Sequence, residues 1–231
     1  MMNGPLIAIL GGARETARAV EWLARAGARG VVIWDADNEP ADFEFDAAAR
    51  EVLSCAAGLL DASHAFAEAP RRAAVALAPG VPYARVGRAE WVPTPQDNWT
   101  QVDTLDDAVA ALPAGGRVFA ATGRGSLNAL ARHDGPVFVR QLSRHDLPMP
   151  LANGQFVFGT APFSVASEVA LFRKLEIDVV LARNIGGAGS FPKLAAAREL
   201  NMPAVLLSAP ALPNGPHLAS FDDVKSWIAT L

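Results

Sequence analysis

Short apolar runs and longer amphipathic stretches alternate along the chain. The apolar runs are rich in Val, Ile and Leu and are bounded by glycine or proline, a pattern typical of strands that are buried on both faces of a sheet. The longer stretches carry apolar residues at helical spacing. This regular alternation predicts an α/β protein with mainly parallel sheets that are flanked by helices.

Turn and capping signals set the boundaries of these elements. The stretches from Thr104 to Asp107 and from Ser220 to Asp223 have the form of capping boxes, which begin helices. The expected strands are 6–10, 31–34, 58–60, 83–86, 117–121, 137–140, 155–158, 178–182 and 204–208. The expected helices are 15–26, 46–54, 104–112 and 164–175, one that reaches about 77, one that ends near 132, one from about 190 to 201, and one that starts at Ser220.

Residues 93–99 interrupt the alternation with two prolines and a polar cluster, and we interpret them as a linker. We therefore expect two Rossmann-like lobes. The N-terminal lobe comprises residues 1–95 and the C-terminal lobe comprises residues 96–231, with a ligand cleft between them.

Three glycine turns follow expected strands and open helices. In the last of them, Gly186 and Gly187 let the backbone adopt positive φ or approach a ligand, and the next helix offers free N–H groups to an anion. A tight turn without a ligand is the alternative reading, and the flanking Asn184 and Lys193 favour a site. The turn after strand 6–10 lacks the third glycine of the dinucleotide fingerprint. The residues assigned to cofactor binding are Gly11, Gly12, Arg14, Thr122, Gly123, Arg124, Asn184, Gly186 and Gly187.

Two acidic positions follow expected strands. Asp61 comes after strand 58–60, with His64 three residues on, so a proton donor could lie there. In the alternative reading, Asp61 caps the next helix and His64 is merely packed. Asp35 stands where an acid would bind a ribose hydroxyl, or else it is a solvated acid in the polar turn that contains Asp37 and Glu39.

Composition and charge narrow the class of protein. With 51% hydrophobic and 19% charged residues, the chain can bury a large core, and no apolar run is long enough to span a membrane. The only cysteine is Cys55, which excludes an internal disulfide and a zinc site built on cysteines, and indicates a reducing, cytoplasmic setting. The net charge of −4, with acids and bases interspersed, gives no nucleic-acid footprint.

Several motifs in combination resemble the precorrin-6A reductase family of corrin biosynthesis. They are GGARE at 11–15, DASHAFA at 61–67, RVGRAEWVP at 85–93, DNW at 97–99, RVFAATGRGSL at 117–127, FVRQL at 138–142, TAPF at 160–163 with Glu168, and RNIGG with KLAAARELNMPAV over 183–205. The resemblance implies two Rossmann-like lobes and the NADPH-dependent reduction of one double bond of the precorrin-6A macrocycle, which gives precorrin-6B. The chain departs from the family pattern after its second strand, where part of an N-terminal glycine-rich loop is missing.

The resemblance also implies roles for residues. Hydride transfer from NADPH would be completed by a proton from Asp61 or His64, directly or through water. The tetrapyrrole substrate carries many carboxylates, and no metal is expected to bind. The residues assigned to the substrate are Arg85, Arg88, Trp91, Arg140, Phe163, Arg183 and Lys193. We expect a monomer or small homo-oligomer that needs no nucleic-acid or membrane partner.

Other classes of protein make different demands on the sequence. A short-chain dehydrogenase is excluded, because Tyr83, the only tyrosine, is followed four residues later by Gly87 and not by lysine. A Rossmann-type methyltransferase and a non-catalytic tetrapyrrole-binding homologue remain alternatives.

The cofactor itself leaves two possibilities. The acids at 35, 37 and 39 would repel the 2′-phosphate of NADPH at the second strand. Either the adenosine binds near residues 122–126, where Arg124 can pair with phosphate, or the chain prefers NADH.

Overall fold

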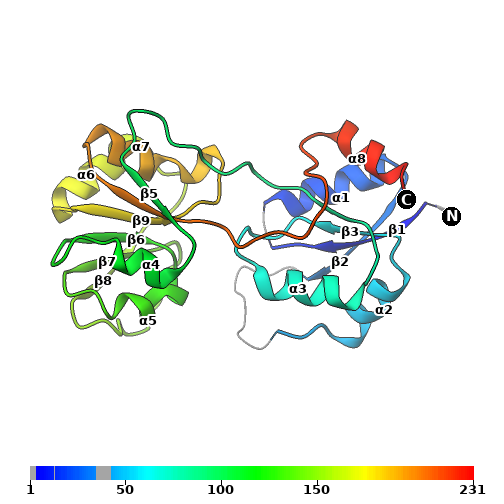
Figure 1. Ribbon diagram of the computed structural model, residues 1–231, viewed down its shortest axis with the longest axis horizontal. Helices are drawn as coiled ribbons and strands as arrows, with labels where there is room; N and C mark the ends of the chain where they lie inside the picture. The colour runs from blue at the N-terminus through cyan, green and yellow to red at the C-terminus, as the bar shows by residue number, and fades with distance from the viewer. Residues whose placement is uncertain (1–3, 13, 35–42) are drawn as a thin grey trace. The chain divides into compact units, whose positions relative to one another are not determined.

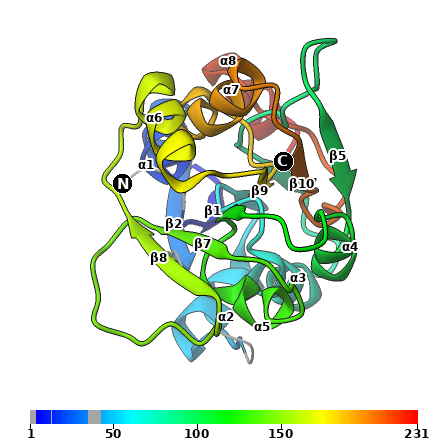
Figure 2. The same cartoon turned by 90° about the vertical axis from the view of Figure 1, so that its left-hand side faces the viewer.

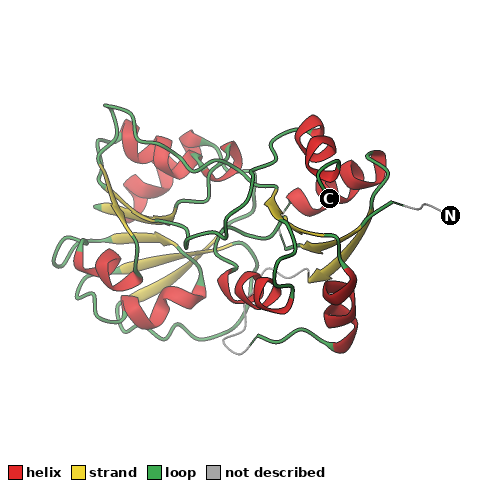
Figure 3. Cartoon of the chain, turned by 45° about the vertical axis from the view of Figure 1, so that its right-hand side comes forward, coloured by secondary structure: helices red, strands yellow, loops and turns green. Residues whose placement is uncertain are grey.

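The computed structural model describes residues 4–12, 14–34 and 43–231. The chain divides into two compact units, one made of residues 1–88 with 210–231 and the other of residues 89–209. Each unit has one sheet with helices on both of its faces (Figures 1 and 3). The expected α/β class with parallel sheets is confirmed, since every strand pairing among the described residues is parallel.

The first unit has a four-stranded sheet in the order β2-β1-β3-β4. Its elements are β1 (Leu6–Leu10), α1 (Glu15–Arg25), β2 (Arg29–Trp34), α2 (Ala47–Cys55), β3 (Gly58–Asp61), α3 (Glu68–Leu77), β4 (Tyr83–Arg85) and α8 (Phe221–Ile228). Alternate residues of β1 serve the two cores: Ile7 and Ile9 pack with α1 and α8, whereas Ala8 and Leu10 pack with α2 and α3. This strand is therefore buried on both faces, as its continuous apolar run predicts.

The segment 210–231 belongs to the first unit, although the expected boundary placed it in the C-terminal lobe. Its backbone runs beside β4, where Leu218 N–H donates to the Arg85 carbonyl at 2.8 Å. Trp227 of α8 then covers the start of β3, and a Cβ at Gly58 would lie 2.8 Å from its ring. The segment joins the first unit because the apolar face of α8 completes the core over α1. The order of the elements along the chain does not reveal this packing.

The second unit has a six-stranded sheet in the order β5-β10-β9-β6-β7-β8. Its strands are β5 (Trp99–Val102), β6 (Val118–Ala121), β7 (Val137–Gln141), β8 (Gly154–Phe158), β9 (Val179–Arg183) and β10 (Ala204–Leu207). Its helices are α4 (Leu105–Ala110), α5 (Leu127–Leu130), α6 (Val165–Leu175) and α7 (Pro192–Glu199), with 3-10 turns η1 (Arg124–Ser126) and η2 (Ala188–Ser190). α4 and α5 pack on one face of the sheet, and α6 and α7 pack on the other.

Two connections of this unit depart from the simple alternation. β5 was not among the expected strands, and its first residue, Trp99, was assigned to the linker. The strand pairs with β10 at the edge of the sheet, and its central Thr100 and Gln101 are exposed. A polar edge strand of this kind gives no apolar run to detect. Residues 142–153 carry the chain from β7 to the parallel β8 without a helix, and Figure 2 shows this long loop beside β8.

The predicted helix starts are confirmed by their caps. Thr104 and Ser220 each accept a hydrogen bond from the backbone N–H three residues on, and Ser164 forms a capping box with Ser167. These side chains satisfy N–H groups that the first helical turn leaves without partners.

Candidate functional site

In the first unit, the carboxyl ends of β1 and β3 lie side by side where the strand order reverses. β1 leads through α1 to β2 on one side, and β3 leads through α3 to β4 on the other. Leu10 is in register with Asp61, so the turn at Gly11 and Gly12 adjoins the loop that follows β3. Open α/β sheets bind ligands outside the carboxyl ends of their strands at such a reversal.

The glycine turn of this unit is built for a sharp change of direction. Gly12 has a φ of 98°, which favours glycine, and buried Gly11 donates its N–H to the Trp34 carbonyl at 2.6 Å. Arg14 is exposed at the start of α1. The acids Asp35, Asp37 and Glu39 lie outside the described residues, so their predicted role at a ribose stays a prediction.

Asp61 is the centre of a buried hydrogen-bond network. One carboxylate oxygen accepts the N–H and the hydroxyl of Ser63, at 2.9 and 2.5 Å, and the other accepts Arg71 Nε at 2.5 Å and the Tyr83 hydroxyl at 2.6 Å. Only 3% of the residue is exposed. Burial, reinforced by the charge of Asp61, raises the pKa of Tyr83, so this hydroxyl remains a donor. Asp61 therefore fixes the loop and α3 through four donors.

These contacts bear on the two readings of Asp61 drawn from the sequence. The carboxylate does not cap a helix, because α3 begins at Glu68 with Ala67 as its N-cap residue. It also meets four donors from its own unit, which occupy both oxygens. The geometry favours a structural role for Asp61 over direct proton transfer.

His64 is held in one tautomer by its own loop. Its Nδ1 accepts the backbone N–H of Phe66 at 3.2 Å, so the neutral ring carries its proton on Nε2. Charging the ring would place a second N–H against the Phe66 donor. The half-buried imidazole is thus arranged as a hydrogen-bond donor through Nε2.

The two arginines after β4 differ in their partners. Arg88 Nε lies 3.2 Å from the carboxylate of Glu15, which ties the segment after β4 to the start of α1. Arg85 ends β4 and is half-buried beside the 216–218 segment. The structure therefore leaves Arg85 better suited than Arg88 to a carboxylate of a ligand.

The second unit has its own strand-order reversal, between β6 and β9. β6 leads through α5 to β7, and β9 leads through α7 to β10 on the opposite side. Ala121 and Ala182 are in register at the ends of the two strands. The predicted turns at 122–126 and 184–187 are therefore neighbours, and a Cβ at Gly125 would lie 3.9 Å from Arg183 Nη2.

The turn after β6 is fixed by two hydroxyls. Buried Thr122 and Ser126 share a hydrogen bond of 2.6 Å, and the Ser126 hydroxyl donates to the Gly123 carbonyl at 2.8 Å. Gly123 has a φ of 78°. Arg124 projects from this rigid turn and is exposed, with its guanidinium carbon 5.5 Å from the centre of the Phe156 ring. A turn that presents a fixed arginine suits a phosphate group.

The turn after β9 is held in place by hydrogen bonds to Trp91. The Asn184 side chain accepts Trp91 N–H at 2.9 Å and donates to the Trp91 carbonyl at 3.0 Å, and it has no exposed surface. The Trp91 indole N–H donates to the Gly187 carbonyl at 3.0 Å. Gly186 and Gly187 both have positive φ, at 67° and 78°. Asn184 and Trp91 thus shape the turn.

A group of charged side chains lies beside this turn. Arg140 Nη2 donates to buried Glu168 at 2.7 Å, and the arginine is sandwiched with its guanidinium carbon 4.3 Å from the Phe163 ring centre and 5.0 Å from that of Phe119. Gly159 makes room for it, since a Cβ there would lie 2.5 Å from Arg140 Nη1. Lys193, on the first turn of α7, contributes the second positive charge that acts on Glu168. We call Arg140, Glu168 and Lys193 the charged triad.

Comparison with known proteins identifies the family. The profile of the family described as precorrin-6x reductase CbiJ/CobK matches residues 6–229. The chain belongs to this family. Precorrin-6A reductase of Rhodobacter capsulatus is 37% identical over 177 residues, which are 74% of this chain and 70% of that protein. The precorrin-6A reductase of Rhodococcus erythropolis is 36% identical over 75% of this chain and 71% of its own length.

The solved structure of CobK precorrin-6A reductase has the same fold as this member of the precorrin-6x reductase family. It matches with a TM-score of 0.79 and 30% sequence identity over 98% of this chain and 97% of that one. The resemblance inferred from the motifs is confirmed.

Sequence reasoning gave no role in the site to three residues that help to build it in this precorrin-6x reductase homologue. Arg71 and Tyr83 complete the shell of Asp61, and Glu168 joins Arg140 to the Lys193 region. An arginine or glutamate at a core-facing position of a helix pattern was a usable signal of a buried ion pair, because such residues are rarely buried unless they are paired. Arg71 and Glu168 are each 3% exposed.

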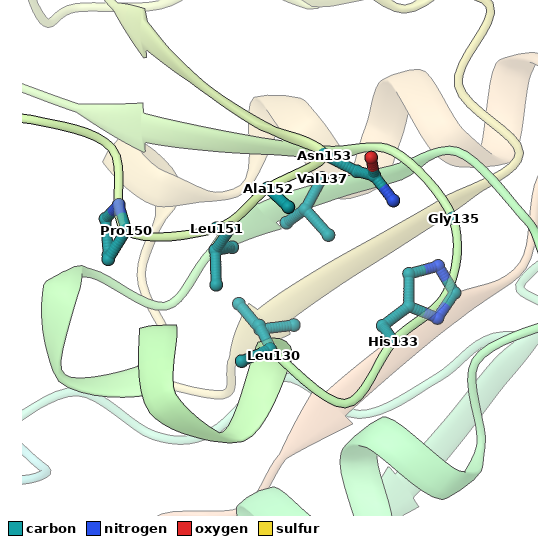
Figure 4. Close-up of a pocket in the computed structure, with 9 residues that line it drawn as sticks. Leu130, His133, Gly135, Val137, Pro150, Leu151, Ala152 and Asn153 are labelled. Atoms are coloured by element: carbon teal, nitrogen blue, oxygen red, sulfur yellow. The ribbon is translucent and has the colours of Figure 1, made fainter.

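The second unit also contains a pocket of about 270 Å³. Figure 4 shows it between the end of α5 and the start of β7, with Leu130, His133 and Val137 among its lining residues. It therefore lies at the amino end of β7, away from the glycine turns that follow β6 and β9. Its remaining lining residues are Ala131, Gly135, Pro150, Leu151, Ala152 and Asn153.

The described residues contain neither a metal-binding cluster nor a membrane-spanning helix. No group of three or more His, Cys, Asp or Glu within them could hold a metal ion. Over the same part of the chain, no helix has the length and apolar character needed to cross a membrane.

Proposed function

We propose that this protein reduces one double bond of the precorrin-6A macrocycle, or of its cobalt-containing form, with NADPH in cobalamin biosynthesis. The observation that carries the proposal is the match to CobK precorrin-6A reductase over 98% of the chain. Relatives named precorrin-6A reductase and cobalt-precorrin-6A reductase both match, so either form of the substrate fits the family.

The proposed cofactor site is the turn after β6. NADPH supplies the hydride, and the protein supplies position and charge. Thr122, Gly123 and Ser126 hold the backbone of the turn, and exposed Arg124 pairs with the 2′-phosphate. This assignment avoids the acids at 35, 37 and 39, which would repel that phosphate. Gly11, Gly12 and Arg14 of the first unit, and Asn184, Gly186 and Gly187 of the second, stay predictions as cofactor contacts.

The proposed substrate contacts are basic side chains at the carboxyl ends of the strands. Arg85 and Arg183 end β4 and β9, so they are placed where ligands of such sheets bind, and each can pair with a carboxylate. Arg88 and Arg140 already have carboxylate partners in Glu15 and Glu168, and they serve mainly to position these acids. Phe163, stacked on Arg140, offers an aromatic face to the macrocycle.

The proposal gives Asp61 and His64 supporting roles in the proton step. Asp61 has four donors and holds the loop in place, and His64 supports the same loop by accepting the Phe66 N–H at its Nδ1. Neither of these two side chains is proposed as the source of the proton.

Absorbance at the nicotinamide band tests the proposal. Purified protein is mixed with precorrin-6A and NADPH, and loss of NADPH in proportion to added macrocycle supports the reductase. Binding of the macrocycle without NADPH loss would support a non-catalytic tetrapyrrole carrier. Methyl transfer from S-adenosylmethionine without NADPH loss would support the methyltransferase.

Location and assembly are part of the same proposal. A cytoplasmic monomer or small homo-oligomer is consistent with Cys55 as the only cysteine, since the chain cannot close an internal disulfide.

A further inference from the structure

Lys193 lies close to the glycine turn that follows β9 in the second unit. It lies on the first turn of α7, directly after the turn at Gly186 and Gly187 that follows β9. Its Nζ donates to the Ser190 carbonyl at 2.5 Å and lies 5.6 Å from the centre of the Trp91 ring. The ammonium group is therefore held at the strand-order reversal, where ligands of such sheets bind.

The charged triad determines the electrostatics of this lysine. Glu168 from α6 is the acid that acts on it, and Arg140 from β7 is the other base. The remaining neighbours that the structure gives it are the Ser190 carbonyl and the Trp91 ring. The two cations and one anion leave a net positive charge in a largely buried place. Since Arg140 is bound to Glu168 at 2.7 Å, the acid is shared between two bases.

The triad shifts the proton affinity of its members in a consistent way. Burial lowers the pKa of Lys193, Glu168 opposes this shift and Arg140 adds to it, and together they bring the pKa to about 8. Burial also raises the pKa of Glu168 against the opposing effect of Arg140 and Lys193. A proton donor works best when its pKa is near the working pH. An ordinary lysine holds its proton too tightly for this task.

We propose that Lys193 is the general acid of the reduction. This inference rests on the proposed function. Hydride from the nicotinamide ring forms a C–H bond at one carbon of the substrate double bond, and the π electrons move to the neighbouring carbon. That carbon takes a proton from Lys193 Nζ, the cofactor is left oxidised, and the neutral amine regains its proton from water. One hydride and one proton thus saturate the double bond.

Glu168 and Arg140 act as positioning residues in this scheme. Glu168 keeps the amine protonated at neutral pH. Arg140, whose guanidinium lies over the Phe119 and Phe163 rings, fixes the Glu168 carboxylate through its hydrogen bond. The two neighbours should therefore shift the titration of Lys193 in opposite directions. Removing the negative charge lowers its pKa, and removing the positive charge of Arg140 raises it.

The first experiment measures the titration without turnover. The chain has three lysines, Lys174, Lys193 and Lys225, and reductive 13C-methylation gives each an NMR signal that Lys→Arg variants assign. Exposed Lys174 and Lys225 are internal references in the same sample. We expect the Lys193 midpoint to be lowest, to fall further in Glu168→Gln and to rise in Arg140→Met. A Lys193 midpoint equal to those of the references would overturn the inference.

The second experiment separates proton transfer from charge. Single-turnover hydride transfer is followed with NADPH and precorrin-6A in Lys193→Arg and Lys193→Met. A general acid predicts that both variants lose about 10²-fold or more in rate while their NADPH affinity is unchanged. If Lys193 only binds a carboxylate, Lys193→Arg keeps the parent rate and Lys193→Met mainly raises KM, and the inference is wrong.

The pH profile distinguishes failure of this inference from failure of the proposed function. In the parent, kcat should fall as pH rises through about 8, because the donor loses its proton, and this limb should move to lower pH in Glu168→Gln. An active parent without such a limb would contradict the role of Lys193 alone. A parent that does not oxidise NADPH at all would contradict the proposed function, while the lysine titration would remain measurable.

Discussion

The side-chain amide of Asn184 is hydrogen-bonded at both of its ends to the backbone of Trp91, with the N–H at 2.9 Å and the carbonyl at 3.0 Å. Ninety-three positions separate the two residues in sequence, yet one side chain replaces the partners that a sheet would give to the Trp91 peptide groups. Asn184 is fully buried, so a substitution there leaves buried polar groups without hydrogen-bond partners.

We expect Asn184→Ala to lower the free energy of unfolding by about 1–3 kcal/mol, because the N–H and C=O of Trp91 lose their partners. Urea denaturation followed by tryptophan fluorescence measures the change. The matched control is Asn153→Ala, which removes a long, exposed hydrogen bond of 3.4 Å and should change stability little. Equal stability of the two variants would contradict the structural role of Asn184.

Asp61→Asn should destabilise the protein by about 1–3 kcal/mol, because the amide NH2 would face donors from Arg71, Tyr83 or Ser63. Thermal unfolding measures this loss, and His64→Ala should have a smaller effect on the same scale. A variant with parental stability and a turnover reduced about 10²-fold would show that Asp61 takes part in the reaction.

Arg124→Ala should weaken NADPH binding by about tenfold or more, the scale of one charged hydrogen bond to phosphate, and leave NADH binding unchanged. Fluorescence titration with both cofactors measures this difference. Arg144→Ala is the control, since Arg144 is also exposed and also lies over a ring, 5.5 Å from the centre of Phe158. Equal losses of NADPH and NADH affinity would argue against a 2′-phosphate contact.

Gly187→Val should reduce ligand affinity more than it reduces stability. The valine would add a β-branched side chain at a φ of 78° beside the Gly187 carbonyl that Trp91 holds. Gly80→Val is a matched control for backbone strain, because Gly80 has a φ of 80° and no atom within 4 Å of its Cβ position. Cofactor and substrate affinities that remain at the parent values in Gly187→Val would show that this turn does not contact a ligand.

The stability of the protein should depend on pH through Lys193. Its pKa is lowered to about 8 in the folded state, so between pH 8 and the pKa of the unfolded chain, near 10.5, the unfolded state binds more protons. Stability attributable to this group should therefore rise with pH across that window. The difference in unfolding free energy between the parent and Lys193→Met, measured at pH 7.5, 8.5 and 9.5, isolates the effect. A difference independent of pH would contradict the shift. Above pH 10 Tyr83 opposes this trend, because its raised pKa favours a protonated folded state.

The sequence was sufficient for the fold class and for most elements because buried parallel strands give continuous apolar runs. The run at Leu6–Leu10 and that at Val179–Arg183 were both located in this way. β5 was missed because Thr100 and Gln101 lie exposed on an edge strand and show no apolar pattern. The glycine turns at the two strand-order reversals were also predicted, because a backbone with positive φ favours glycine, which is visible in the sequence.

The interior of the candidate site was harder to predict. Asp61 was predicted to be a site residue, but its partners Arg71 and Tyr83 lie ten and twenty-two residues further along the chain. Trp91 and Lys193 were assigned to the substrate, while the structure shows contacts of both with the turn that they flank. Pairings of this kind depend on which helices face each other, and a single sequence carries no record of that.

Because residues 210–231 complete the first unit, the second unit is an insertion within it. During synthesis, β1 to β4 leave the ribosome long before α8, and the apolar surface of α1 that α8 covers stays open while the whole of the second unit is made. The second unit is continuous in sequence and can fold as soon as β10 has emerged. Synthesis of the first unit therefore begins before that of the second and is completed after it, so part of its apolar surface stays exposed for that interval.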